Sequence, residues 1–299
     1  MAALSLEAQR RNPAPAGVAP DWTVPQHWSR YTPEQHGIWN RLFERQQAQL
    51  ARRVVPAFRT GVEVLGLGAH GIPRFEALNQ RLSAITGWSV VAVPGIVPEE
   101  VFFHHLANRR FVAGRFIRTP AQLDYLQEPD VFHDVFGHVP LLADAAYARY
   151  MQAYGEAGVR AREGPILRHL ARLYWYTVEF GLMRAGDGLR LFGAGIVSSN
   201  GESAYALDSR EPLRIGFDVC RIMRTEYRID SFQKNYFVID SFEDLVRRTA
   251  DADFTELYAQ LAALPSIPVG THLPGDVLYP PNPQRSCAQA QRGEPLPVI

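Results

Sequence analysis

The chain has 299 residues, 46% of them hydrophobic, and its 31 basic residues balance its 31 acidic residues. A neutral chain lacks the basic excess that is typical of nucleic-acid-binding proteins and of electrostatic membrane binding. Two cysteines exclude a disulfide framework and a cysteine-rich zinc site, so we expect a cytoplasmic protein. The sequence shows neither a signal peptide nor the about 18 successive apolar residues of a membrane span.

The first half of the chain predicts helices. Residues 1–25 hold four prolines among small and polar residues, which indicates a flexible lead-in. Thr32-Pro33-Glu34-Gln35 has the cap, proline and glutamine of a helix start. A second helical stripe begins at Phe75 and stops at Gly87, and a third helix runs from Pro98 to about Phe111.

The second half mixes helices with short strands. Helices are predicted around 130–142, 145–162 and 166–185, and again after Ser241 and from Phe254. Residues 189–192 form a candidate strand, and 227–230 is expected to pair with 236–239 across a turn. Proline and polar residues make 279–299 an irregular tail. We therefore expect one domain over 26–278, mainly α within the α+β class, with packed helices and a few short strands.

Two histidines, His133 and His138, lie five positions apart in a largely apolar segment. Residues with this spacing are about 140° apart on a regular α-helix, so the two imidazoles would not share a face. Gly137 weakens the helix and Pro140 cannot donate a hydrogen bond, which predicts a widened turn that brings both rings round. Two unrelated histidines on a buried helix are the alternative.

A carboxylate among aromatic residues, Glu179, follows His138 after 41 positions. Two neutral imidazoles and one carboxylate form a ligand set that suits non-haem Fe(II) and leaves positions open for dioxygen. A buried carboxylate is costly without a partner, and a metal would supply one. An ion pair of Glu179 with Arg172 or Arg184 is the alternative.

The segment His133-Asp134-Val135-Phe136-Gly137-His138-Val139-Pro140-Leu141 resembles the H-(E/D)-x-x-G-H-V-P-L signature of the pterin-dependent aromatic amino acid hydroxylases. Residues 174–181 and 193–202 resemble the next two blocks of that family in the same order. The resemblance spans about residues 30–245 and is greatest to short bacterial members. It implies a catalytic domain with an iron site in a central cleft. It also implies a monomer, because the tetramerisation tail of animal members is missing.

The resemblance also implies residue roles. Iron would be held by His133, His138 and Glu179. The positions that match the tetrahydropterin side of the family are Gly95, Val97, Phe102, Asp134, Ala171 and Tyr174. Phe102 would stack on the flat pterin ring, with a core aromatic as the alternative. Asp134 stands where many members have glutamate, and whether its shorter side chain reaches the pterin directly stays open.

The substrate side is implied in the same way. The carboxylate of the amino acid would pair with Arg118, supported by Asp130, whereas a solvated surface arginine is the alternative. The other positions matching this side are Tyr125, Leu126, Pro129, Trp175, Gly195, Ser198 and Glu202. Leu126 replaces a threonine that animal members often carry. The glycine-rich stretch 193–201 is expected to give close backbone approach to the substrate.

Substrate choice is indicated by two residues. Trp175 matches phenylalanine and tyrosine hydroxylases, whereas tryptophan hydroxylases tend to have phenylalanine there. Ile229 falls near a position where tyrosine hydroxylases carry aspartate, and an apolar residue suits an apolar ring. We therefore expect a phenylalanine 4-monooxygenase that makes L-tyrosine from L-phenylalanine with dioxygen, a tetrahydropterin and Fe(II). The alternatives are a tyrosine or tryptophan hydroxylase, a zinc hydrolase and a non-catalytic metal-binding protein. The absence of an H-E-x-x-H motif argues against the zinc hydrolase.

Overall fold

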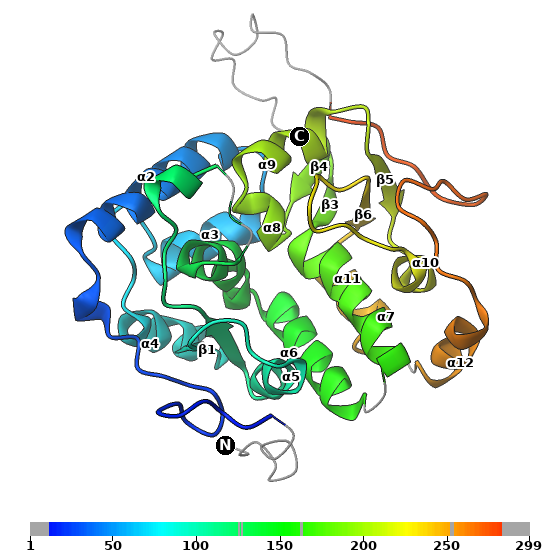
Figure 1. The fold of residues 1–299 in the computed structure, drawn as a ribbon. Helices are drawn as coiled ribbons and strands as arrows, with labels where there is room; N and C mark the ends of the chain where they lie inside the picture. The colour runs from blue at the N-terminus through cyan, green and yellow to red at the C-terminus, as the bar shows by residue number, and fades with distance from the viewer. Residues whose placement is uncertain (1–11, 125, 127, 162–163, 252–253, 283–299) are drawn as a thin grey trace, which may run out of the picture.

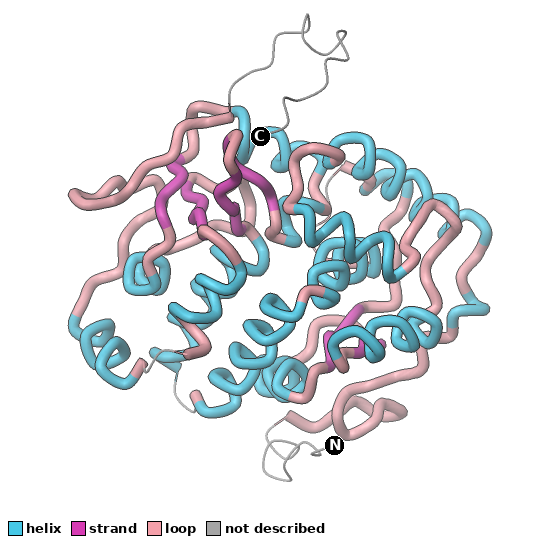
Figure 2. Tube along the Cα trace, turned by 180° about the vertical axis from the view of Figure 1, so that it is seen from behind, coloured by secondary structure: helices cyan, strands magenta, loops and turns pink. Residues whose placement is uncertain are grey.

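A computed structural model of the protein describes residues 12–124, 126, 128–161, 164–251 and 254–282. Helices are the main secondary structure in this part of the chain, as Figures 1 and 2 show. The α-helices are α2 (Pro33–Leu50), α3 (Pro56–Leu65), α4 (Phe75–Thr86), α5 (Glu99–Ala107), α6 (Ala145–Arg160), α7 (Gly164–Tyr174), α8 (Ala194–Val197), α9 (Asn200–Asp208), α10 (Val219–Arg224), α11 (Phe242–Arg248) and α12 (Thr255–Ala263). The mainly α architecture expected from the sequence is confirmed.

The described strands form two small sheets. In the larger sheet the order is β4-β3-β6-β5, with β3 (Gly181–Ala185) and β4 (Gly188–Leu191) antiparallel. Strands β5 (Leu213–Gly216) and β6 (Asn235–Ile239) are parallel, as are β3 and β6. The smaller sheet pairs β1 (Ser89–Ala92) with β2 (Arg110–Ala113) in parallel. Figures 1 and 2 place the two sheets far apart, with helices between them.

Several helix ends lie where the sequence predicts them. Helix α2 begins with a capping box, because Thr32 Oγ1 accepts from the Gln35 N–H and the Gln35 side chain accepts from the Thr32 N–H. Helix α4 ends at Gly87, whose φ of 76° is the left-handed conformation of a C-terminal glycine cap. The predicted helix from Pro98 is too long, since Arg109 has a φ of 55° and turns the chain into β2.

Two predictions in the second half are wrong. The helix expected over 166–185 ends at Tyr174, continues as a π-helical segment η5 (Trp175–Glu179), and gives way to β3. The hairpin between 227–230 and 236–239 does not form, because β6 lies between β3 and β5 with every residue buried. The main chain next to residue 227 pairs with a different segment, since the N–H of Glu226 donates to Ile267 O at 2.9 Å.

The ends of the chain are described only in part. Residues 12–25 lack helices and strands, yet the Val24 N–H donates to Ala92 O at 2.9 Å. At the other end the Asn282 N–H donates to Leu207 O at 2.8 Å. Residues 1–11 of the predicted flexible lead-in and 283–299 of the predicted irregular tail lie outside the described residues.

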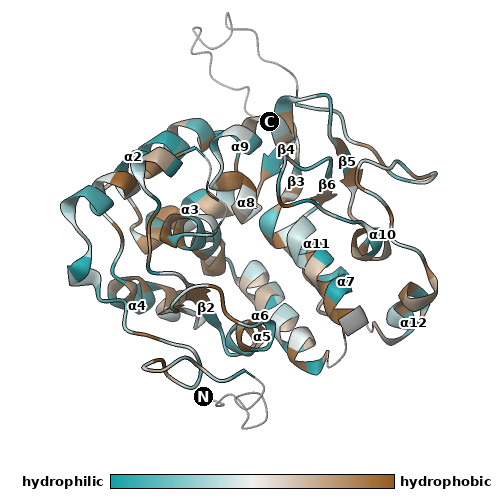
Figure 3. Ribbon diagram, in the orientation of Figure 1, coloured by the Kyte–Doolittle hydropathy of each residue, from teal (hydrophilic) through white to brown (hydrophobic). Residues whose placement is uncertain are grey.

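The core is rich in aromatic rings behind the two histidines. Figure 3 shows brown, hydrophobic stretches along the ribbons where helices meet, with teal on their outer sides. Phe132 and Phe136 are fully enclosed and stack with ring centroids 4.8 Å apart. Trp39 from α2 packs edge-on against Phe132, and Phe58 from α3 does so against Phe136. The segment that carries His133 and His138 is therefore fixed from its apolar side.

No helix in the described part of the chain is long and apolar enough to cross a bilayer.

Two helical glycines test how tightly this region is packed. A Cβ added to Gly61 in α3 would lie 2.0 Å from Pro140 O, whereas one added to Gly37 in α2 meets nothing within 4 Å. We expect Gly61→Ala to lower the free energy of unfolding by about 1–3 kcal/mol through overpacking. Gly37→Ala should raise it by about 0.5–1 kcal/mol, because alanine restricts the unfolded chain and favours helix. Urea denaturation measures both; equal effects would contradict the tight contact between α3 and Pro140.

Candidate metal centre

Two π-helical segments carry the three candidate metal ligands. Segment η3 (His133–His138) starts and ends on the two histidines, and η5 ends on Glu179. In η5 the Phe180 N–H donates to Trp175 O at 2.8 Å, which is the five-residue hydrogen bond of a π-helix. A turn closed over five residues brings side chains five apart close to the same face. The widened turn predicted at Gly137 is thus confirmed, while the second one, at Glu179, was not foreseen.

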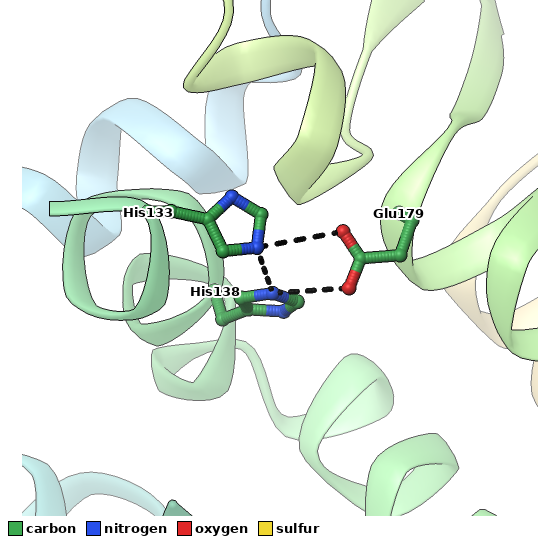
Figure 4. A group of neighbouring side chains, drawn as sticks. All are labelled: His133, His138 and Glu179. Atoms are coloured by element: carbon green, nitrogen blue, oxygen red, sulfur yellow. Dashed lines mark hydrogen bonds and ion pairs between the residues drawn. The ribbon is translucent and has the colours of Figure 1, made fainter. Parts of the chain in front are cut away.

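The three side chains converge on one point, as Figure 4 shows. His133 Nε2 and His138 Nε2 are 3.2 Å apart. Glu179 Oε1 lies 3.3 Å from His138 Nε2, and Glu179 Oε2 lies 3.7 Å from His133 Nε2. These separations suit ligands on one face of a metal ion, since bonds of about 2.1 Å at right angles place donors roughly 3 Å apart. The donor set therefore fits a divalent metal such as iron.

Ser198 sets the tautomer of His133. The Ser198 hydroxyl donates its one proton to Ala194 O at 2.7 Å, so it can only accept from His133 Nδ1 at 2.9 Å. With the proton on Nδ1, the Nε2 of His133 presents its lone pair toward Glu179. The ring of His138 is oriented by packing instead, with Phe111 at 4.7 Å and Tyr174 at 6.4 Å between centroids. His138 Nδ1 is buried without a hydrogen-bond partner among the described residues, so of the two histidines His133 alone has the outer hydrogen bond typical of a metal ligand.

The charge state of the centre also suits metal binding. Burial lowers the pKa of His133 to about 4, so the imidazole is neutral at pH 7. Burial alone would raise the pKa of Glu179, but His138, His133 and the Gly195 N–H bring it below its usual value. The ion pairs considered for Glu179 do not form. Arg172 donates to Met223 O and Ser266, and Arg184 pairs with Asp240.

In the glycine-rich stretch, Gly193 and Gly195 lie close to the main chain of Glu179. A Cβ on Gly193 would lie 2.4 Å from Glu179 O, and one on Gly195 would lie 3.1 Å from the same atom. The approach of this stretch to a substrate stays a prediction, and in the structure the stretch approaches the backbone of the third ligand. Only glycine permits it at Gly193, because the neighbouring atoms are backbone that cannot move aside.

A cavity of about 300 Å³ opens beside the three ligands. It is lined by Val93, Gly95, Ile96, Val97, Glu99, Phe102, Phe111, Val112, Gly114, Pro129, His133, Asp134, His138, Tyr174 and Glu179. Its size is at the lower end for small-molecule sites. The rings of Phe102 and Tyr174 meet edge to face with centroids 5.6 Å apart, which offers apolar surface for a flat ring. Asp134 accepts from the Gly114 N–H at 2.7 Å.

The cavity gathers most of the residues expected on the cofactor side. Gly95, Val97, Phe102, Asp134 and Tyr174 all line it, whereas Ala171 does not. Further lining residues were missed from the sequence, among them Phe111 and Gly114. Phe111 lies in β2 and Gly114 follows it, and the run Arg110-Phe111-Val112-Ala113 has no polar–apolar alternation that would have indicated a strand.

The residues expected on the substrate side fall into two groups. Arg118 is buried and pairs with Asp130 through two hydrogen bonds, Nε–Oδ2 at 2.8 Å and a second guanidinium nitrogen to Oδ1 at 2.9 Å. This overturns the alternative of a solvated surface arginine. Asp130 Oδ1 also accepts from the His133 N–H at 3.0 Å, so the same carboxylate connects Arg118 to the first ligand.

The other substrate-side positions are more scattered. Pro129 lines the cavity, and Gly195 and Ser198 contact the ligands Glu179 and His133. Leu126 is half-buried, and Tyr125 lies outside the described residues. Ile229 is 70% exposed, so it does not form an apolar wall for a buried substrate ring in this structure.

Glu202 and Trp175 belong to a hydrogen-bond network that the sequence did not reveal. Glu202 Oε1 accepts from the Gln233 N–H at 3.0 Å and from the Tyr236 hydroxyl at 2.8 Å. Trp175 Nε1 donates to Gln233 Oε1 at 3.0 Å. Gln233 stands in an irregular stretch with no motif around it, so no sequence pattern marked it.

The fold and the convergent site define a metal-binding protein with a small-molecule cavity at its centre. Residues 11–257 match the family described as biopterin-dependent aromatic amino acid hydroxylase. The chain is 56% identical to a phenylalanine-4-hydroxylase of Caulobacter vibrioides over 89% of this chain and 90% of that protein. The protein therefore belongs to the biopterin-dependent aromatic amino acid hydroxylase family.

Solved structures of Chromobacterium violaceum phenylalanine hydroxylase share the fold. The one with bound iron and phenylalanine has a TM-score of 0.83 and 51% identity, covering 87% of this chain and 94% of that one. The one with iron(III) and oxidised cofactor 7,8-dihydrobiopterin has a TM-score of 0.84 and 50% identity, covering 93% of this chain and all of that one.

The Ser198–His133 hydrogen bond can be tested by metal binding. Ser198→Ala removes the acceptor that fixes the proton on His133 Nδ1. We expect the affinity for Fe(II) to fall about 10–100-fold, as for other groups that orient a metal-binding histidine. Anaerobic Fe(II) titration measures it, with Ser83→Ala on an exposed face of α4 as the control. An unchanged affinity in Ser198→Ala would show that the hydroxyl does not orient the ligand.

The buried carboxyl group of Glu202 predicts a pH dependence of stability. Burial raises its pKa to about 7 from 4.5, so between these values the folded protein holds a proton that the unfolded chain has released. Stability contributed by this group therefore falls as pH rises from about 4.5 to 7 and is level above that. Glu202→Gln should flatten this part of the profile of unfolding free energy against pH, measured by denaturant titration. A profile that keeps its slope in the variant would mean that another group titrates.

Proposed function

We propose that the protein is a phenylalanine 4-monooxygenase that converts L-phenylalanine to L-tyrosine with dioxygen and a tetrahydropterin. The observation that carries the proposal is the convergence of two imidazoles and one carboxylate beside an aromatic-lined cavity. Membership of the hydroxylase family supports it, as does the high identity to a protein named phenylalanine-4-hydroxylase. Residues 26–278 would form the catalytic domain.

His133, His138 and Glu179 would hold the iron. Bound Fe(II) and the reduced pterin would together supply the electrons and the open coordination positions that oxygen activation requires. The protein contributes a neutral ligand pair and one negative charge, so a divalent ion at this point would keep one net positive charge. The surrounding core keeps the three ligands from rotating away, which holds the site ready before the metal binds.

The tetrahydropterin would occupy the cavity lined by Gly95, Val97, Phe102, Asp134 and Tyr174. The ring of Phe102 would stack on the flat heterocycle, and main-chain groups of the 95–97 stretch would pair with its edge. Asp134 would face the pterin with the oxygen that Gly114 leaves free. Ala171 does not line the cavity, so in this proposal it would act only by allowing close packing beside Tyr174.

The substrate would bind through Arg118. Its guanidinium is already oriented by Asp130, and the N–H groups that Asp130 leaves unused would donate to the carboxylate of an amino acid. The ring would then lie toward the metal, near Pro129, Trp175 and the backbone of Gly195, with Ser198 and Glu202 supporting these elements. Tyr125 and Leu126 would complete this side. Holding the ring in one pose beside the metal is how the protein would direct the reaction to the para carbon.

The oligomeric state and compartment are also part of the proposal. We propose a monomer in the cytoplasm, where two cysteines suit a reducing compartment.

Reconstitution tests the function directly. Fe(II) loading without oxygen, followed by L-phenylalanine, a tetrahydropterin and air, should give tyrosine by chromatography only when all components are present. Parallel assays with L-tyrosine and L-tryptophan should give less product per unit time. More hydroxylated product from either of these would assign the enzyme to another substrate within the family.

Removal of the carboxylate ligand should abolish both metal binding and turnover. In Glu179→Ala we expect Fe(II) affinity to fall by more than about 100-fold and tyrosine formation to fall with it, because two imidazoles alone hold iron weakly. Metal analysis and product assay on the same sample measure both, with the exposed Glu44→Ala of α2 as the control. Full iron content with full activity in Glu179→Ala would defeat the ligand assignment.

A further inference from the structure

Gln233 makes hydrogen bonds with every polar group of its side chain. It is 3% exposed and lies in the loop between α10 and β6. Its Oε1 accepts from Trp175 Nε1 at 3.0 Å, and its Nε2 donates to Arg228 O at 2.9 Å and to Ser231 O at 3.4 Å. The amide cannot be reversed, because its nitrogen would then face the indole N–H and its oxygen the two carbonyl groups.

The main chain of Gln233 is fixed as well. Its N–H donates to Glu202 Oε1 at 3.0 Å, and the same oxygen accepts from the Tyr236 hydroxyl at 2.8 Å. Glu202 is in turn placed by Ser199, whose side chain caps the start of α9 by accepting from the Glu202 N–H. The acceptor offered to Trp175 therefore stands on a rigid support rather than on a mobile loop.

Trp175 is held on its ring faces by aromatic neighbours. Tyr227 stacks on the indole with centroids 4.3 Å apart and planes 18° apart, and Phe180 packs at 4.8 Å. These contacts pack against the faces of the indole, and the hydrogen bond from Nε1 to Gln233 holds its edge. Trp175 begins the π-helical segment that ends on Glu179, so its position and that of the ligand are linked.

We propose that Gln233 is a positioning residue that locks the indole of Trp175 and so helps determine which aromatic amino acid fits beside the metal centre. This inference rests on the proposed function, in which Trp175 faces the substrate ring. Tryptophan at position 175 and glutamine at position 233 form a donor–acceptor pair. Phenylalanine at position 175 would leave Gln233 Oε1 buried without its donor.

A pair of single variants and their combination test this link. Gln233→Met removes the acceptor while nearly keeping the volume, Trp175→Phe removes the donor, and the double variant removes both. Gln26→Met is the matched control, because its amide likewise bridges backbone groups, Pro73 O and the Phe75 N–H, but contacts neither Trp175 nor the cavity. Thermal unfolding of all four verifies that each is folded before activity is compared.

A spectroscopic measurement reads the hydrogen bond without substrate. The chain has five tryptophans, so ¹⁵N-indole labelling gives five Nε1–H signals, and the one lost in Trp175→Phe belongs to Trp175. Gln233→Met should move the Trp175 signal upfield and leave the other four in place. Gln26→Met should leave the Trp175 signal in place. An unmoved Trp175 signal in Gln233→Met would overturn the proposal.

Steady-state kinetics then read the consequence for the substrate. With iron-loaded enzyme, Gln233→Met should raise KM for L-phenylalanine about five- to tenfold with a smaller change in kcat, the effect of losing about one hydrogen bond. The same change made in Trp175→Phe should alter KM by less than about twofold, because the donor is already absent. Equal effects in both backgrounds would overturn the proposal.

Failure of the wild-type enzyme to make tyrosine would refute the proposed function, whereas the indole signals would still decide whether Gln233 positions Trp175.

Discussion

The metal centre depends on two π-helical turns. A regular α-helix would separate His133 from His138, and a regular continuation of α7 would aim Glu179 elsewhere. Each turn forfeits the better hydrogen-bond geometry of an α-helix, so the surrounding packing must stabilise it. That packing is visible in the stacked rings of Phe132 and Phe136 behind η3 and in the close approach of Gly193 to the backbone of Glu179. The aromatic core and the glycine-rich stretch thus hold the side chains of His133, His138 and Glu179 in their converging positions.

Buried charge around the site is balanced group by group. Asp130, fully enclosed, accepts from both the guanidinium and the N–H of Arg118 and from the N–H of His133. Such a carboxylate would be very costly without these donors. Because one acid satisfies both Arg118 and the first ligand, a group suited to bind a substrate carboxylate is mechanically connected to the metal centre. A shift of Arg118 when a ligand binds would move His133 as well, because the Asp130 side chain connects the two residues.

The sequence predicted this centre better than it predicted the fold around it. His133 and His138 could be paired from their spacing and from Gly137 and Pro140, because helix-breaking residues act locally. Helix starts at Thr32 and Ser241 were equally local and were predicted correctly. The end of α7 at Tyr174 was not, since the switch to η5 and β3 is stabilised by pairing with β6, more than 50 residues later. Gln233 was invisible for the same reason: its role lies in contacts with residues distant in the sequence.

Protein groups pack against each of the three ligands, and one side of the group faces a cavity. His133 is covered by Ser198, His138 by the rings of Phe111 and Tyr174, and Glu179 by the glycines of the 193–195 turn. The open side of the group faces the cavity. A metal held there would have its protein ligands locked and its free positions directed into a space shaped for small molecules. A metal centre that reacts with dioxygen needs both features: protein ligands that stay in place, and free coordination positions that small molecules can reach.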